Sequence, residues 1–400
     1  MERFLYREVF LLKKTVLLST LCLLILSTAI SSALAETLGF GFVNNSDVAL
    51  RRGIGGKTIV RLPVSACVWI KDSKADNHGV LWYEVNAGIH IDYSNVDYSG
   101  WMKAEFVDAG ETLWHDIQSV SVSRSGMIAL KTDGTVEAAG SLVAPEASDW
   151  RTAREWSKSL RNVGQAGFCE HSMVRYALEQ GGTCHQYGAS PGILGVSRLR
   201  LVGGNINAYG ITEDNRLIMG DSDVSVSWAY PHTPDPEDLS HVVSIEDNLC
   251  RVLLLTDEGK VFASEDTSND TEPEWENWTD IISLEASSCA FSGESNYHTA
   301  YAAVRRNGTV IAAPEELSRL IESWTDMAKI VIGDRWVLGL KQDGSVLSAG
   351  YAGTVPPDVS GWKDIVDIGT GYDYCVGIRE NGTAVFEGEY VFMREGHNRK

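Results

Sequence analysis

Four residues in one stretch of the chain have the chemistry of zinc ligands: Cys169, His171, Cys184 and His185. Thiolate and imidazole groups are the ligands that zinc sites use. Between the two pairs, Gly181-Gly182 predicts a two-residue hairpin turn that pairs Cys184 with Glu179. Cys169 then lies at the far end of the preceding strand, more than ~10 Å away at about 3.3 Å per residue. We therefore predict no metal site here, and the same separation disfavours a disulfide between Cys169 and Cys184.

Other signatures of catalysis are missing from the sequence. It contains no Gly-x-Ser-x-Gly turn, no His-Glu-x-x-His helix and no phosphate-cradling glycine loop. The acidic stretches 221–228 and 264–274 lack the ligand spacing of a calcium loop. Two carboxylates can still meet in space, as in glycoside hydrolases, and a sequence does not show this. We expect a protein that is not an enzyme and uses no cofactor, with a hydrolase as the alternative.

The first 35 residues have the pattern of an export signal. A basic segment with four Lys or Arg residues precedes an apolar stretch that begins at Val16, and Ala33-Leu34-Ala35 forms a small-residue cleavage site. An uncleaved membrane anchor is the alternative, although the Ser and Thr residues in the apolar stretch favour cleavage. No later stretch approaches the ~20 apolar residues of a membrane helix. We predict a secreted or envelope protein.

The charge balance argues against nucleic acid as a partner. The full chain has a net charge of −20, and residues 1–35 contribute four basic and two acidic residues, so cleavage leaves about −22. Such an acidic protein repels a phosphate backbone. Acidity also has a simpler interpretation, which is solubility outside the cell.

A repeated unit organises most of the chain. Trp-x-Asp followed by Ile or Met occurs at Trp114, Trp278, Trp324 and Trp362. Alignment on a turn residue that tolerates a left-handed backbone gives seven units, with turns at Gly134, Gly182, Asn215, Gly259, Gly308, Gly344 and Gly382. An aliphatic residue lies four positions before each turn, preceded by Ala or Gly in six units. A small residue at a fixed strand position indicates that something packs closely against that backbone.

The spacing of the units predicts the fold. Successive turns lie 48, 33, 44, 49, 36 and 38 residues apart, and each unit contains three clear strands. Four strands at a period near 41 residues are typical of a propeller blade, and a ring of blades buries faces that one blade leaves open. We therefore predict an all-β chain with a seven-bladed β-propeller at 109–400. In each unit the Asp of Trp-x-Asp is expected to hydrogen-bond a backbone turn.

Units of the form W-x-D-I…A-L…D-G-T-V…G resemble the regulator of chromosome condensation repeat, over residues 110 to about 390. The short units and the export signal are similar to the secreted bacterial members of that family, some of which inhibit β-lactamases. The second unit lacks the Trp-x-Asp opening and has only Trp156 upstream, and the third lacks both the Trp and the turn glycine.

Residues 36–108 do not share the period and predict five short strands of a small β-barrel. LWYEVNAG and SGWMKAEFV within this segment resemble a bacterial SH3-like domain. That resemblance implies binding of cell-wall peptide or a spacer role. Trp82, Tyr83 and Trp101 either line a ligand groove or form the core of the barrel.

Specificity in a propeller is expected in the loops that do not repeat. The loops between the first and second strands of the blades share one face, and we call it the loop face. Its candidate binding residues are Arg124, Phe168, Glu170, His171, Asn205, Asn207, Asn248, Asp334, Arg335, Trp336, Tyr372, Asp373 and Tyr374. Trp, Tyr and Arg are favoured at interface hot spots, although each residue taken singly is equally consistent with an ordinary solvated loop.

Cys250 and Cys289 fall on loop-face loops of adjacent blades, so a disulfide between them is a further hypothesis. The sequence thus predicts a monomeric, exported, non-catalytic scaffold that binds an envelope or extracellular protein, or cell-wall peptide, through the loop face. The alternative is an extracellular hydrolase that acts on glycan or peptide in the propeller channel.

Overall fold

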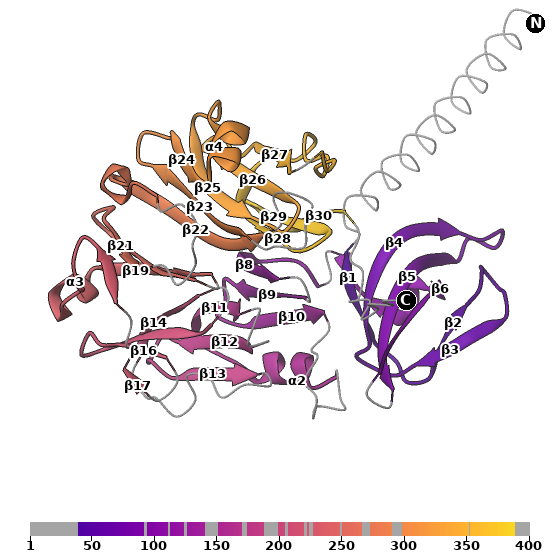
Figure 1. Ribbon diagram of the computed structural model, residues 1–400. Coiled ribbons are helices and arrows are strands. Elements are labelled where there is room, and N and C mark those ends of the chain that lie inside the picture. Colours follow the sequence, from indigo (N-terminus) through magenta and orange to yellow (C-terminus); the bar gives the residue numbers. More distant parts are fainter. Residues whose placement is uncertain are drawn as a thin grey trace, which may run out of the picture.

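A computed structural model describes residues 39–91, 94–110, 113–123, 126–140, 151–169, 174–187, 199–204, 207–219, 222–223, 227–248, 250–265, 273–289, 298–351 and 353–388 (Figure 1). The predicted export signal lies outside these residues. Among the residues described, no helix is both long enough and apolar enough to span a membrane.

The N-terminal part is a single bent antiparallel sheet of seven strands in the order β3-β2-β6-β5-β4-β1-β7 (Figure 1). Its strands are β1 (Phe40–Val43), β2 (Val48–Arg51), β3 (Thr58–Leu62), β4 (Cys67–Ala75), β5 (Leu81–Ile91), β6 (Ser94–Lys103) and β7 (Val107–Asp108), with a 3₁₀ turn η1 (Ala104–Phe106) before β7. The sequence predicted five strands, and β1 and β7 are the additions. The concave face holds an aliphatic core that includes Leu50, Val85 and Met102.

Seven further antiparallel sheets follow in chain order, and in each of them the strand at one edge lies innermost. The first three consist of β8 (Ile117–Ser123), β9 (Gly126–Lys131) and β10 (Val136–Gly140); β11 (Val163–Cys169), β12 (Val174–Glu179) and β13 (Cys184–Tyr187); and β14 (Leu199–Gly203), β15 (Tyr209–Thr212), β16 (Leu217–Met219) and β17 (Ser222–Asp223). The fourth contains β19 (Val242–Asp247), β20 (Val252–Thr256) and β21 (Val261–Ser264), with β18 (Trp228–Tyr230) at its outer edge.

The last three sheets are β22 (Ile281–Cys289), β23 (His298–Arg305) and β24 (Val310–Ala313); β25 (Met327–Ile332), β26 (Trp336–Lys341) and β27 (Val346–Gly350); and β28 (Ile365–Thr370), β29 (Tyr374–Arg379) and β30 (Ala384–Gly388). The described residues thus give four strands in two sheets and three in the rest. Helices α2 (Arg151–Ser159) and α4 (Glu315–Ile321) pack against the outer strands β10 and β24, at the edge where a fourth strand would lie.

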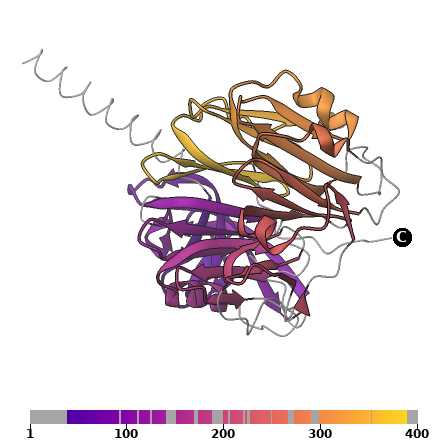
Figure 2. The same ribbon diagram turned by 90° about the vertical axis from the view of Figure 1, so that its left-hand side faces the viewer.

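The seven innermost strands form a closed ring. Each contacts the innermost strand of the next sheet, and β28 of the last sheet contacts β8 of the first. Both views show the first sheet, in purple, beside the last, in yellow (Figure 1 and Figure 2). The chain is therefore all-β with a seven-bladed β-propeller, which confirms the predicted fold class. The sheets are numbered below as blades one to seven.

The turns that defined the repeat differ in type from the prediction. Gly134 donates its N–H to the carbonyl of Lys131, and the N–H of Lys131 donates to the carbonyl of Thr135. The loop therefore has three residues rather than two. Such a loop needs one left-handed residue. The glycine supplies it, with φ of 75° at Gly134 and 79° at Gly382, and Asn215 supplies it in blade three with φ of 58°.

The Trp-x-Asp sequence joins each blade to the one before it. Asp326 adopts a left-handed conformation with φ of 59°, and its carbonyl oxygen accepts a hydrogen bond from the turn residue Gln342. The Asp thus bonds the turn as predicted, but through its backbone. The next amide, at Met327, donates over 3.0 Å to the carbonyl of the turn residue Gly308 in the preceding blade. Left-handed Asp116, Asp280 and Asp364 occupy the same place in blades one, five and seven.

The tryptophan of the same sequence explains the small residue in the second strand. A Cβ atom added at Gly339 would lie 2.6 Å from Trp324, and one at Gly377 would lie 2.8 Å from Trp362. Real carbon atoms do not approach so closely. The ring therefore packs directly on the backbone of the second strand, as the fixed Ala or Gly position predicted.

In the described residues, the first sheet contains only strands β8 to β10 and the last only β28 to β30, and hydrogen bonds and packing join them. Ile117 donates its N–H to the carbonyl of Gly382 over 2.9 Å. The Tyr374 hydroxyl lies 3.0 Å from the carbonyl oxygens of Ser123 and Gly126 in blade one. The N-terminal sheet covers this seam, because one apolar cluster combines residues from three places: Phe40, Phe42, Cys67 and Trp69 of that sheet, Trp114, Ile117 and Met127 around blade one, and Tyr374, Val376 and Ile378 of blade seven.

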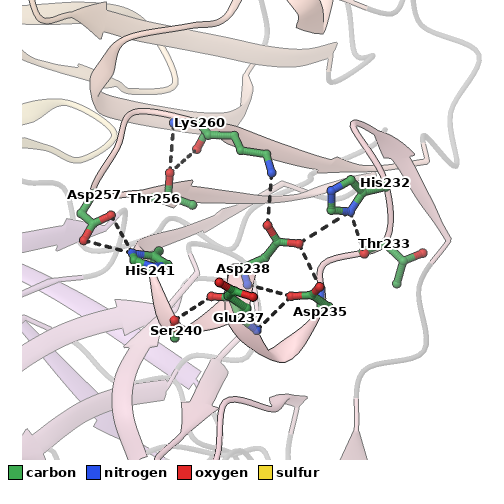
Figure 3. Close-up of polar contacts among 10 residues, drawn as sticks. All are labelled: His232, Thr233, Asp235, Glu237, Asp238, Ser240, His241, Thr256, Asp257 and Lys260. Atoms are coloured by element: carbon green, nitrogen blue, oxygen red, sulfur yellow. Dashed lines mark hydrogen bonds and ion pairs between the residues drawn. The ribbon is translucent and has the colours of Figure 1, made fainter.

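Blade four carries a polar network on its outer side (Figure 3). Helix α3 (Pro236–Ser240) begins at Asp235, whose side chain accepts hydrogen bonds from two backbone amides of the first turn. Asp238 of this helix pairs with Lys260 over 3.1 Å, and His241 lies 3.2 Å from Asp257. These contacts hold the segment before β19 against the β20–β21 hairpin. The network therefore has a structural role in blade four.

Candidate functional site

Several predicted loop-face residues are buried and serve the fold. Trp336 is 5% exposed, and its indole N–H donates to Thr370 of the next blade over 2.7 Å. Tyr374 is fully buried in the seam between blades one and seven. The loops end one residue earlier than predicted, because β26 and β29 begin with these aromatic residues. The expectation that Trp336 and Tyr374 offer binding surface is therefore wrong.

Phe168, Asn248 and Asn207 also have structural partners. Phe168 is 4% exposed, and the guanidinium of Arg175 lies 5.0 Å from the centre of its ring. The side-chain oxygen of Asn248 accepts backbone hydrogen bonds from Cys250 and Arg251, which fixes the loop before β20. Asn207 donates to the carboxylate of Asp247 over 3.1 Å. The predicted residues Arg124, Glu170, His171 and Asn205 lie outside the described residues.

Arg335 and Tyr372 remain exposed on two adjacent loops, with the partly buried Asp373 beside them. Arg335 forms an ion pair with Asp373. Its guanidinium carbon also lies 5.8 Å from the ring centre of Tyr372, which is 44% exposed. The hydrogen bond to Asp373 raises the pKa of Arg335 above its ordinary value. The structure thus brings together three of the predicted residues, from blades six and seven, and we call them the loop-face triad.

The three aromatic residues proposed for a groove in the N-terminal sheet do not share a face. Directly paired residues of antiparallel strands point to the same side, and successive residues alternate. Tyr83 pairs with the core residue Met102 and packs on the concave side, whereas Trp101 pairs with Glu84 on the other side. Trp82 is 5% exposed, and its indole N–H donates to Asp76 over 3.1 Å. The register therefore contradicts a single groove formed by all three.

The cysteines are arranged differently from the first expectation in one detail. Cys184 pairs with Leu178 rather than Glu179, because the turn has three residues. Cys169 and Cys184 are both free thiols, and burial raises the pKa of Cys184 to about 12. Among the described residues no group of His, Cys, Asp and Glu forms a metal site. His171 lies outside the described residues. The side chain of Cys289 is not described either, so the Cys250–Cys289 disulfide stays a prediction.

The ring encloses a cavity of about 670 Å³, which is lined by the innermost strands of all seven blades. Each of these strands has a register shift after its first residue, so the next residue is an extra one at the start of the strand. Beyond this bulge the side chains alternate again, so the first and third residues after the extra residue lie on one side of the strand, and both positions contribute to the cavity lining. Sequence analysis missed these channel residues because the bulge shifts the alternation by one position.

Charged channel residues gather on four consecutive blades. Glu246, Glu285, Lys329 and Asp367 come from blades four, five, six and seven. At the same two positions after the bulge, blades one and two present Ser119, Ser121 and Gln165 instead. The signal in the sequence was the occurrence of these charges inside short strands that are otherwise Val, Ile, Ser and Ala.

Lys329 and Asp367 form an ion pair of 2.6 Å across the boundary between blades six and seven. The other carboxylate oxygen of Asp367 accepts the backbone N–H of Val120 in blade one over 2.9 Å. Burial alone would lower the pKa of Lys329, but Asp367 outweighs it, and the pKa lies above its ordinary value. Asp367 therefore connects three blades where the ring closes.

Glu285 faces the same channel without an ion pair of this kind among the described contacts. Burial raises the pKa of Glu285 well above its ordinary value, and the negative charge of Glu246 adds to the effect. Lys329 and the backbone N–H of Ile332 oppose the shift only in part. A carboxyl group with a raised pKa beside a second carboxylate has the chemistry of a proton donor, or of a site that attracts a cation.

Comparisons with known proteins find structural likeness only. No protein-family model and no curated protein matches the chain. The ectodomain of the receptor kinase CR4 from Physcomitrella patens is 13% identical, with a TM-score of 0.44 over 69% of this chain and 73% of that one. The CRINKLY WD40 ectodomain of ACR4 from Arabidopsis thaliana is 15% identical, with a TM-score of 0.39 over 69% and 96%.

Yeast RCC1 (Prp20), solved with Kap60, is 14% identical, with a TM-score of 0.34 over 68% of this chain and 70% of that one. At these identities and scores, the assignment of the fold rests on the strand pairing and on the closed ring of contacts.

Proposed function

We propose that the chain is an exported, non-catalytic binding scaffold that holds an extracytoplasmic protein partner, or cell-wall peptide, through the loop face. In this proposal the propeller is of the secreted regulator of chromosome condensation repeat type, and the N-terminal sheet is SH3-like. The export signal and the acidity of the chain support an extracytoplasmic location.

The loop-face triad is the observation that carries the proposal. Arg335 and Tyr372 belong to the residue types that dominate interface energetics, and they are exposed on loops that do not repeat. The ion pair to Asp373 and the contact with the Tyr372 ring hold Arg335 in place before a partner arrives. A preorganised side chain loses less conformational entropy on binding.

The structural roles of the other candidate binding residues favour a scaffold over an enzyme. Trp336, Tyr374 and the Asp residues of Trp-x-Asp all hold blades together, and they recur because the architecture recurs. A repeat whose common residues are structural keeps its specificity in the positions that differ from blade to blade.

The test is capture of partners from the native secretome and cell wall by the immobilised protein. We expect the double variant Arg335→Ala/Tyr372→Ala to capture at least tenfold less partner than the wild type does. Arg319→Ala is the matched control, because it removes an exposed arginine of α4 that pairs only with Glu315 of its own helix in the contacts described. Undiminished capture by the double variant, with Arg319→Ala also unchanged, would refute the assignment of the loop-face triad.

A hydrolase is the second candidate function, and the neighbouring carboxyl groups of Glu246 and Glu285 in the channel favour it. The pKa of Glu285 is raised and the charge of Glu246 acts on it, which matches an acid and its partner. Incubation of the purified protein with peptidoglycan and with a peptide panel tests this function. Turnover that Glu285→Gln removes would establish it, and absence of turnover on all substrates would leave the scaffold.

A further inference from the structure

The β2–β3 hairpin of the N-terminal sheet carries positive charge in a chain that is otherwise strongly acidic. Residues 48–62 contain four Lys or Arg residues and no Asp or Glu, whereas the whole chain has a net charge of −20. Three of the four, Arg51, Arg52 and Lys57, flank the Gly-Ile-Gly-Gly segment at the end of the hairpin. We call residues 51–57 the basic tip.

The charges of the basic tip are not balanced within the hairpin. Arg52 and Lys57 lie directly opposite each other, because the N–H of Arg52 donates to the carbonyl of Lys57 over 3.0 Å. Both residues are exposed, and in the contacts described neither side chain meets a carboxylate. The nearby Asp47 pairs instead with Arg61 over 3.0 Å. Like charges directly opposite each other destabilise a hairpin, so the basic tip keeps a repulsion that an anionic occupant would relieve.

Backbone contacts fix the shape of the basic tip. The guanidinium of Arg51 donates to the carbonyl of Gly56 over 2.9 Å, and the N–H of Gly56 donates to the carbonyl of Gly53 over 2.8 Å. A Cβ atom added at Gly53 or Gly55 would meet no atom within 4 Å, so the space beside these two glycines is open. The tip is therefore formed before an occupant arrives, which reduces the entropy lost on binding.

The basic tip lies at the end of the N-terminal sheet that is remote from the blades. Strand β3 is one edge of this sheet, whereas the residues that cover the propeller seam belong to β1 and β4, toward the other edge. Figure 1 shows β2 and β3 on the side of the sheet that faces away from the propeller. Most of the acidic residues of the chain lie in residues 109–400. An anionic surface can therefore approach the tip without meeting the acidic blades.

We propose that the basic tip binds the surface of an anionic lipid bilayer, with the cationic heads of Arg52 and Lys57 among the phosphate headgroups and Ile54 at the boundary with the acyl chains. Positive charge beside apolar side chains is the combination that binds this interface. The site lies outside the propeller, goes beyond the proposed function and is independent of the loop-face triad.

Two observations favour a bilayer over a smaller or fully polar anion. Ile54 is half-buried at the very tip and Ile59 is 39% exposed, so apolar surface lies among the charges. A soluble polyanion has no apolar layer to receive it. The positive charge also extends along β3 to Arg61, about 13 Å of strand beyond Lys57, which is farther than one phosphate group spans.

Cosedimentation with lipid vesicles tests the proposal on the protein as purified after export. One set of vesicles is phosphatidylcholine alone, and in the other set one third of the lipid is phosphatidylglycerol. We expect the protein to bind the anionic vesicles at least tenfold more tightly than the neutral ones, with binding that weakens as salt is added. Equal binding to the two sets of vesicles would overturn the proposal.

Charge variants then locate the site. Arg52→Gln/Lys57→Gln should weaken binding to anionic vesicles at least tenfold, because each basic residue near such a surface contributes about a fivefold change. Arg306→Gln/Arg319→Gln is the matched control, because it removes two exposed positive charges from the propeller and gives the same net charge. Any contribution of residues 1–35 is common to these variants and cancels. An equal loss of binding in the control would overturn the assignment to the basic tip.

Two further measurements separate a bilayer from a soluble polyanion. Ile54→Ser should weaken binding to anionic vesicles at least threefold, and soluble polyphosphate should bind at least tenfold more weakly than the vesicles at equal phosphate concentration. Unchanged binding by Ile54→Ser, or polyphosphate binding as tight as vesicle binding, would overturn the lipid assignment. The Arg335→Ala/Tyr372→Ala variant should bind anionic vesicles as the wild type does, which separates this site from the proposed function.

Discussion

Replacement of Asp367 by Asn tests how the ring is held closed. Asp367 is 8% exposed and accepts three hydrogen bonds: from Lys329 at 2.6 Å, from the Val120 amide at 2.9 Å and from its neighbour Ile368 at 3.0 Å. An Asn side chain keeps the shape but places an amide N–H where one of two donors now points. It also leaves Lys329 without its counter-ion.

The magnitude follows from the burial of each partner. Breaking a fully buried ion pair costs about 3–5 kcal/mol, and a lost hydrogen bond to a charged group costs about 1.5–3 kcal/mol. The Lys329 side chain is 35% exposed and can turn to water in the channel, so the ion-pair cost falls toward the lower end. We expect Asp367→Asn to destabilise the propeller by about 3 kcal/mol. At an m value of about 3 kcal/mol/M, the midpoint of urea unfolding falls by about 1 M.

The assay is urea unfolding followed by tryptophan fluorescence, with the slope of the transition fitted together with its midpoint. Asp364→Asn is the matched control, because Asp364 is exposed at the start of the same blade and its left-handed backbone suits Asn as well. The control should shift the midpoint by less than about 0.2 M. An Asp367→Asn midpoint as close as that to the wild-type value would refute the role of Asp367 in closing the ring.

Three further predictions concern packing, pH and the seam. Gly377→Val should cost about 3 kcal/mol in urea unfolding, since its Cβ alone would lie 2.8 Å from Trp362, and a variant as stable as the wild type would contradict the direct packing of the ring on the strand. Glu285→Gln should stabilise the protein at pH 8 but not at pH 4. A carboxyl group whose pKa is raised in the folded state contributes its full stability below its unfolded pKa, and this contribution is lost as the pH rises through the folded pKa. A difference in stability that does not change with pH would show that Glu285 is solvated. Trp69→Ala should cost about 3–5 kcal/mol and lower the melting temperatures of the N-terminal sheet and propeller together; separate transitions, with the propeller unaffected, would show that the sheet does not seal the seam.

The repeat could be recognised in the sequence because the backbone of nearly every blade requires the same types of residue at the same positions. A left-handed turn residue and a small residue under a tryptophan are needed in nearly every blade, so they survive as a period that the sequence displays. Gly382 and Trp362 illustrate both requirements. The closed ring follows from that period, since seven similar wedges bury one another's faces.

The candidate site was less readable because it depends on where strands begin. A loop and the first residue of a strand look alike in sequence, so Trp336 and Tyr374 were assigned to the exposed face although they start strands and are buried. The channel residues depend on a bulge, and one extra residue moves a side chain from one face to the other. Neither Glu285 nor Lys329 can be placed on the channel axis until the bulge is known.

The ring closure itself is tested most directly by native-state hydrogen exchange at the amide of Ile117. This amide donates to Gly382 of the last blade, just as the amide of Met327 donates to Gly308 at an internal junction. A closed ring predicts similar protection of the two amides, each exchanging only through large-scale unfolding. Fast exchange at Ile117 beside slow exchange at Met327 would mean that blades one and seven are not joined in solution, which would contradict the seven-bladed ring on which the loop face depends.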